Sequence, residues 1–166
     1  PLARNWNGNF GLAAEQESIE QFGVTRDYTI LSVPVSTTFD NTGVGNPIEP
    51  ATHGMRLSLG VTPSLSLGTK GEGTSFFAVM NASASTYFDL THLGISRPGR
   101  SILAFRGTIG SIQGASTWNI PPDQRMYAGG SATVRGYRWQ GVGPQYGNTR
   151  YAIGGPSIDA GSVEYR

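Results

Sequence analysis

The residues best suited to chemistry lie in one irregular stretch, 120–137, which combines paired prolines with the glycine pair Gly129 and Gly130. It ends in Val134-Arg135-Gly136-Tyr137, a run without hydrophobic period. An arginine held in a glycine-flanked loop can pair with a carboxylate through two parallel hydrogen bonds, because its planar guanidinium matches the two carboxylate oxygens. The alternative is a solvent-exposed loop arginine, which is the usual state of this residue.

Other kinds of chemistry find little support in the residue types. His53 and His92 are the two histidines, and no Gly-x-Ser-x-Gly motif accompanies the serines, which disfavours a hydrolase. Cysteine is absent, and spaced clusters of histidines and carboxylates are lacking, so we expect no metal and no cofactor. The pairs Gly43-x-Gly45 and Gly141-x-Gly143 precede no helix and do not indicate a nucleotide loop. We therefore predict that the protein is not an enzyme.

Composition and charge limit the partners. The net charge is +1, Lys70 is the single lysine, and the arginines are scattered, so there is no electrostatic case for nucleic acid. Charged residues make up 14%, against roughly 25% in an average soluble domain, yet hydrophobic residues reach only 37%. Such a chain suits a sheet with one apolar face and one face of small polar groups.

Alternating apolar and polar residues predict an all-β fold, an antiparallel meander of about six strands. The predicted strands cover 10–22, 28–39, 55–67, 75–90 and 101–112, and a sixth begins at Ser162. A long loop at about 113–160 precedes the sixth strand. Pro34 counts against a central position in the second strand, because proline lacks the N–H that a ladder needs.

Strand length and alternation together favour a transmembrane β-barrel, whose apolar face meets lipid while the small polar face lines a water-filled lumen. A soluble β-sandwich or a lipocalin-like barrel alternates in the same way and stays an open alternative. Trp118 is predicted to lie in an interfacial aromatic girdle. The chain starts without Met and ends in what resembles a new strand, so we expect 1–166 to be one partial barrel domain of a longer protein.

An ordered set of motifs resembles the outer-membrane insertase superfamily, the bacterial surface-antigen family of BamA, TamA and the two-partner secretion transporters. The motifs are Pro121-Pro-Asp-Gln-Arg-Met-Tyr-Ala-Gly-Gly130, Val134-Arg-Gly-Tyr137, Gly143-Pro144, Gly154-Gly155 and Ser162-Val-Glu-Tyr-Arg166. His53-Gly54-Met-Arg56 is similar to a family motif in which arginine is more usual than His53. The first of these motifs is most similar to the TamA branch.

The resemblance implies a barrel of about sixteen strands, of which this chain supplies about six. It implies that the loop folds into the lumen and that Val134, Arg135, Gly136 and Tyr137 are its functional positions, with Gly129 and Gly130 shaping the approach. The acidic partner of the loop arginine is expected on a strand beyond Arg166. Glu164 is expected to open the strand that follows the loop.

The function that the resemblance implies is non-enzymatic insertion, assembly or translocation of proteins in the bacterial outer membrane. The implied partners are outer-membrane lipid, unfolded outer-membrane proteins or autotransporters, and a periplasm-spanning inner-membrane protein. Two alternatives stay open: a two-partner secretion transporter or passive pore of the same architecture, and, more remotely, an outer-membrane hydrolase.

Overall fold

The computed structural model describes residues 4–21, 23–45, 49–68, 73–94 and 101–166, and the side chains of Gln21 and His92 are not described. Eight strands form one antiparallel sheet, with two short 3-10 helices. The elements are β1 (Trp6–Phe10), β2 (Ala13–Gln21), β3 (Val24–Ser32), β4 (Val35–Asp40), β5 (Gly54–Gly68), β6 (Thr74–Asp89), η1 (Leu90–Leu93), β7 (Ile102–Gln113), η2 (Pro122–Gln124) and β8 (Ser157–Tyr165). This architecture confirms the all-β antiparallel prediction. Within the described residues, no helix has the length and apolar character needed to span a membrane.

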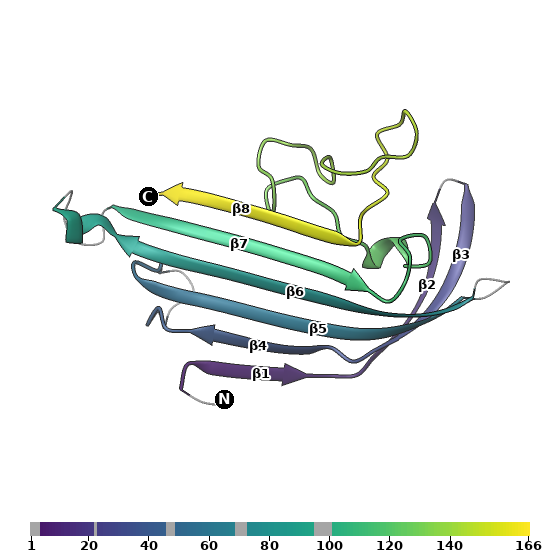
Figure 1. The fold of residues 1–166 in the computed structure, drawn as a ribbon, viewed down its shortest axis with the longest axis horizontal. Coiled ribbons are helices and arrows are strands. Elements are labelled where there is room, and N and C mark those ends of the chain that lie inside the picture. The colour runs from purple at the N-terminus through teal and green to yellow at the C-terminus, as the bar shows by residue number, and fades with distance from the viewer. Residues whose placement is uncertain (1–3, 22, 46–48, 69–72, 95–100) are drawn as a thin grey trace.

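The eight strands amount to six passes of the chain, because β1 with β2 and β3 with β4 each form one interrupted pass. The predicted continuous strands at 10–22 and 28–39 are therefore wrong in detail: pairing breaks at Gly11 and again at Val33-Pro34. The Pro34 carbonyl accepts a hydrogen bond from Gly11 N at 2.9 Å, and Val33 N donates to the Pro63 carbonyl at 3.0 Å. The break lets the β2–β3 hairpin rise away from the plane of the sheet, on the side where residues 114–156 lie (Figure 1).

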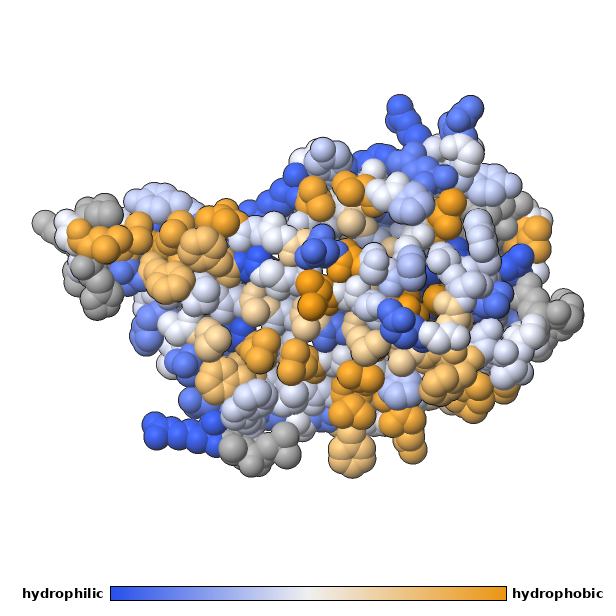
Figure 2. Space-filling model, viewed as in Figure 1, coloured by the Kyte–Doolittle hydropathy of each residue, from blue (hydrophilic) through white to orange (hydrophobic). Residues whose placement is uncertain are grey.

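The central strands β5, β6 and β7 pair along nearly their whole length, and their register sorts side chains into two faces. Ser58, Ser83 and Thr108 stand in one row across these strands on the inner face, the face toward the loop. The adjacent row of Leu59, Ala82 and Ile109 points outward. Apolar residues gather along the lower right edge of Figure 2 and at its left end, near the ends of β6 and β7 in Figure 1, whereas the upper right is mainly pale and blue.

The inner face is not polar throughout. At the end of the sheet where the β2–β3 hairpin rises, the side chains of Phe77, Ile112 and Ile120 form a buried cluster. Tyr28 and Ile30 of β3 are also buried. The expectation of a uniformly small and polar inner face is therefore wrong at this end, because the long loop inserts its own apolar residues there.

At the opposite end of the sheet, the connection from β4 to β5 is fixed by side-chain contacts. The Asp40 carboxylate accepts hydrogen bonds from Thr42 N at 2.9 Å and from Arg56 Nε at 2.6 Å. Met55 N donates to Asn41 Oδ1 at 2.7 Å. Gly54 has a φ of 85°, and a Cβ there would lie 2.9 Å from Asn41 Oδ1. The His53-Gly54-Met-Arg56 motif thus forms a compact strand entry with an ion pair across β4 and β5.

We expect Gly54→Ala to destabilise the sheet by about 1–3 kcal/mol, because a side chain would be forced into a left-handed conformation against the backbone of Thr42. The measurement is the urea midpoint of unfolding of the intact protein in detergent. Gly161→Ala serves as the matched control, since a Cβ at Gly161 meets only an ordinary contact at 3.8 Å. Equal midpoints for the two variants would contradict this account of the strand entry.

Candidate functional site

The candidate site is built by the loop of residues 114–156, which leaves β7, folds over the inner face and returns to β8 (Figure 1). These bounds lie close to the predicted 113–160. The sixth strand begins at Ser157 rather than at Ser162, so the predicted start was wrong. Glu164 consequently lies near the end of β8 and does not open it.

Apolar contacts hold the first part of the loop on the sheet. Ile120 and Phe77 are both 0% exposed, and Met126 packs against the same cluster. Each fully buried side chain of this size stabilises the docked state by about 1.5–3 kcal/mol. Gly110 in β7 makes the approach possible: a Cβ at this position would collide with the Met126 thioether and with Ile158. Gly110, on the inner face of β7, is thus the seat of the loop, the position where Met126 lies directly against the strand.

A buried arginine ties the two ends of the loop together. Arg125 is 4% exposed; its Nε donates to the Ile120 carbonyl at 3.0 Å and its Nη1 to the Ile153 carbonyl, also at 3.0 Å. The Tyr127 hydroxyl donates to the Pro122 carbonyl at 2.7 Å beside it. Burial lowers the pKa of Arg125, which stays charged because guanidinium is far too basic to lose its proton. Burial likewise raises the pKa of Tyr127, so its hydroxyl stays a donor.

Trp118 belongs to this arrangement. Its ring lies 5.7 Å from the Arg125 guanidinium carbon, in cation–π geometry. The interfacial girdle stays a prediction for Trp118, whose ring is 56% exposed and also contacts the loop's own buried cation. Sequence reasoning missed Arg125 itself: the paired prolines before it mark a fixed turn, but nothing in the sequence shows that Ile153 comes back to meet it.

Gly129 and Gly130 lie where the loop doubles back on itself. Both have positive φ, 122° and 88°. A Cβ on Gly129 would lie 2.5 Å from the Arg138 carbonyl oxygen, and one on Gly130 would lie 3.2 Å from the Trp139 ring. The chain path at these two positions therefore requires glycine.

The Val134-Arg135-Gly136-Tyr137 motif divides between two environments. Val134 and Arg135 line a cavity of about 480 Å³ between the loop and the strands β6, β7 and β8. Gly136, with a φ of 89°, and the 61% exposed Tyr137 do not line the cavity. The structure thus places the predicted arginine in the cavity lining and the predicted tyrosine outside it.

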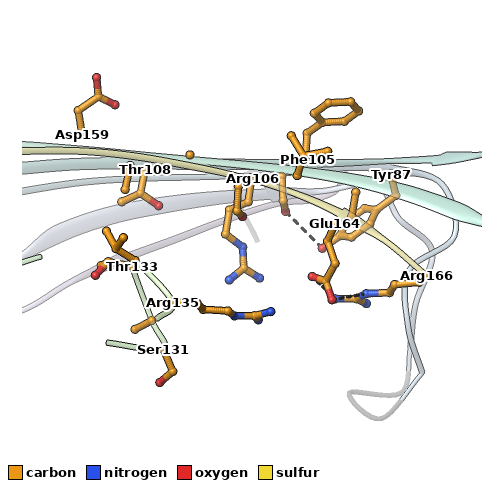
Figure 3. A pocket seen from close by; sticks show the side chains of 18 residues that line it. Tyr87, Phe105, Arg106, Thr108, Ser131, Thr133, Arg135, Asp159, Glu164 and Arg166 are labelled. Carbon is orange, nitrogen blue, oxygen red and sulfur yellow. Dashed lines mark hydrogen bonds and ion pairs between the residues drawn. The ribbon is translucent and has the colours of Figure 1, made fainter. Parts of the chain in front are cut away.

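Charged side chains of the strands face Arg135 across the cavity. Figure 3 shows Arg106 and Glu164 pointing from the sheet toward Arg135, whereas Asp159 and Phe105 point to the opposite face. Arg166 donates to both carboxylate oxygens of Glu164 at 3.2 Å each. Three guanidinium groups and one carboxylate thus line the same cavity. The acidic partner expected beyond Arg166 stays a prediction, and Glu164 already places one carboxylate on this wall.

The cavity offers ion pairs and hydrogen bonds. Within the described part of the chain, no group of three histidines, cysteines, aspartates or glutamates is placed to hold a metal. His53 lies away from the cavity, at the entry to β5, where its Nδ1 lies 3.0 Å from Thr52 Oγ1. The arrangement is suited to hold a loop against a wall.

Fold and loop together define a class: a strongly paired antiparallel sheet, apolar outside, with a long loop folded against its inner face. A family model described as the Omp85 superfamily domain matches residues 1–166, and the chain belongs to this superfamily. Omp85 proteins are outer-membrane β-barrel proteins that insert or translocate other proteins, and they are not enzymes. The family expectation drawn from the loop motifs is confirmed at the level of the superfamily.

We expect Gly110→Ala to displace the loop, because overpacking against Met126 costs about 1–3 kcal/mol. The readout is tryptic cleavage after the buried Arg125, which requires undocking and should become roughly ten-fold faster, since cleavage follows the open population. Cleavage after the exposed Arg138 and Arg150 supplies an internal reference.

Gly107→Ala is the matched control for this experiment. Gly107 lies in the same strand, on the outer face, and a Cβ there meets nothing within 4 Å. Its rate of cleavage after Arg125 should equal that of the parent protein. An unchanged rate in Gly110→Ala would mean that the loop does not depend on this seat.

Proposed function

We propose that the protein acts in the bacterial outer membrane as a component for assembly, insertion or translocation of other proteins, and that it is TamA-like. The observation that carries the proposal is the match to the Omp85 superfamily over residues 1–166. The substrates are unfolded outer-membrane proteins, autotransporters among them. A periplasm-spanning inner-membrane partner fits the TamA-like motif in 121–130.

The second part of the proposal concerns the loop. Val134-Arg135-Gly136-Tyr137 braces the lumen, with Arg135 held electrostatically near Glu164 of β8. Two observations support this part: both side chains line one cavity, and they point toward each other in Figure 3. Gly129 and Gly130 give the loop the sharp path that brings Arg135 to the wall.

The apolar base of the loop favours an assembly factor over an open pore. Ile120 and Phe77 are fully buried against each other on the inner face, so this end of the sheet is filled by protein. Single-channel recording on the intact protein distinguishes the two functions. A small, flickering conductance agrees with an assembly factor, whereas a large steady conductance would identify a pore.

Arg135→Ala in the intact protein is expected to lower the rate at which a client barrel inserts into lipid vesicles, because the loop loses its attraction to Glu164. Glu164→Gln should have an effect of similar size. The double variant should be no worse than either single one, since paired residues are not additive. Arg150→Ala, at an exposed arginine of the same loop, is the control and should insert clients at the parent rate. Full activity of Arg135→Ala would remove the loop from the function.

Neighbouring residues of β5 test which face meets lipid. Leu59→Arg should cost about 2–4 kcal/mol, because the outward row would carry a charge into the bilayer. Ser58→Arg, one residue away on the inner face, should be nearly neutral. The measurement is the denaturant midpoint of folding into vesicles for both variants. Equal costs, or the reverse order, would contradict a barrel whose outer face is the Leu59 row.

A further inference from the structure

Arg125 contacts both arms of the loop, although it lies outside the Val134-Arg135-Gly136-Tyr137 motif. Its side chain is 4% exposed, whereas most side chains farther along the same loop, from 131 to 151, are exposed. Within the described part of the chain, its side-chain hydrogen bonds go to two backbone carbonyls and to no carboxylate. A buried charge without a carboxylate partner is costly unless its donors are well satisfied, so its retention calls for a reason.

The contacts of Arg125 supply that reason. Its fork reaches the Ile120 carbonyl on the outgoing arm of the loop and the Ile153 carbonyl on the returning arm, at 3.0 Å each. Backbone pairing between Met126 and Gly155 runs beside it, with N–O distances of 2.9 and 2.8 Å. The guanidinium therefore closes the base of the loop, joining positions that are more than thirty residues apart in the sequence.

The surroundings leave the guanidinium little freedom. Trp118 covers the guanidinium, with its ring centroid 5.7 Å from the guanidinium carbon. The Tyr127 hydroxyl lies close to two carbonyls, at 2.7 Å from Pro122 and 3.4 Å from Ile153. A Cβ on Gly154 would collide with both Arg125 and Tyr127, so the returning arm passes directly over them.

We propose that Arg125 is the positioning residue that fixes the path of the loop across the sheet and thereby places Arg135 at the cavity. Arg125 touches neither Glu164 nor the cavity; it acts by locking the two arms whose far end carries Arg135. Lysine cannot replace it, because a single ammonium lacks the planar fork that reaches both arms at once. The positioning role concerns the loop's place alone, and its consequence for assembly depends on the proposed function.

The test is a distance measurement, which needs no assembly activity. Nitroxide labels on Asn148→Cys in the loop and Ile109→Cys on the outer face of β7 report the loop's position in the intact protein; this segment contains no cysteine of its own. The parent should give one narrow distance peak. Arg125→Lys and Arg125→Met should both lose that peak and give a broad distribution, since each lacks the two-armed fork.

Arg150→Met is the matched control, an exposed arginine in the same loop, and should keep the narrow peak. Migration of unboiled and boiled samples on a detergent gel checks that each barrel is folded. Tyr127→Phe, which leaves the fork intact, should broaden the peak less than Arg125→Lys. If the Arg125 variants do not fold, Gly154→Ala carries the test: its added methyl collides with Arg125 and should broaden the peak, and a narrow peak would overturn the proposal. A narrow parent-like peak in folded Arg125→Lys would overturn the proposal, whatever the assembly assay shows.

Discussion

The docking of residues 118–126 onto the inner face of the sheet is the contact on which the rest of the site depends. A connection as long as 114–156 has a large conformational entropy, and its isolated backbone bridges cannot offset that cost. Ile120 against Phe77 and Ile112 gives the loop a dry anchor, and Gly110 lets Met126 lie directly on β7. The position of Arg135 follows from this anchor, because the segment between them turns sharply at Gly129 and Gly130.

The inner face consequently has an apolar part, filled by side chains, and a polar part that borders a cavity. Where the β2–β3 hairpin rises, the apolar base of the loop fills the space. Farther along β7 and β8, small and charged side chains surround the cavity of about 480 Å³. Buried apolar contacts hold the first part of the loop, whereas charged side chains face one another across the more open space. The first effect is strong and non-directional, and the second is weaker in water but selective.

Much of the sheet could be predicted from the sequence, because a period of two is a local property. β5, β6 and β7 lie within a residue or two of the predicted ranges. Pro34 signalled the break in the second pass, although its effect on the first pass, at Gly11, depends on pairing that one strand cannot show. The first half of β8 escaped prediction because Asp159 and Gly161 occupy its outward face, where apolar residues were expected.

The sequence singled out residues of the loop but could not show their contacts. Glycine pairs and an isolated arginine are visible in a sequence, and they indicated the loop and Arg135. The nearness of Glu164 is set by the β7–β8 register, which pairs Ala104 with Glu164 and Arg106 with Ser162. The burial of Arg125 is set by a return of the chain to Ile153. Both are long-range facts, which no local pattern encodes.

The register also explains why Glu164 shares one cavity with three arginines. Inward positions alternate along β8, so Glu164 and Arg166 share a face and lie two residues apart, close enough for the doubled hydrogen bond between them. Arg106 enters the same space from β7, opposite Ser162. Arg135 lies on the loop side of the same cavity. The doubled hydrogen bond from Arg166 orients the Glu164 carboxylate on the wall that the loop faces. The loop is thus located chiefly by its buried apolar residues, and its far end meets the sheet through polar and charged side chains.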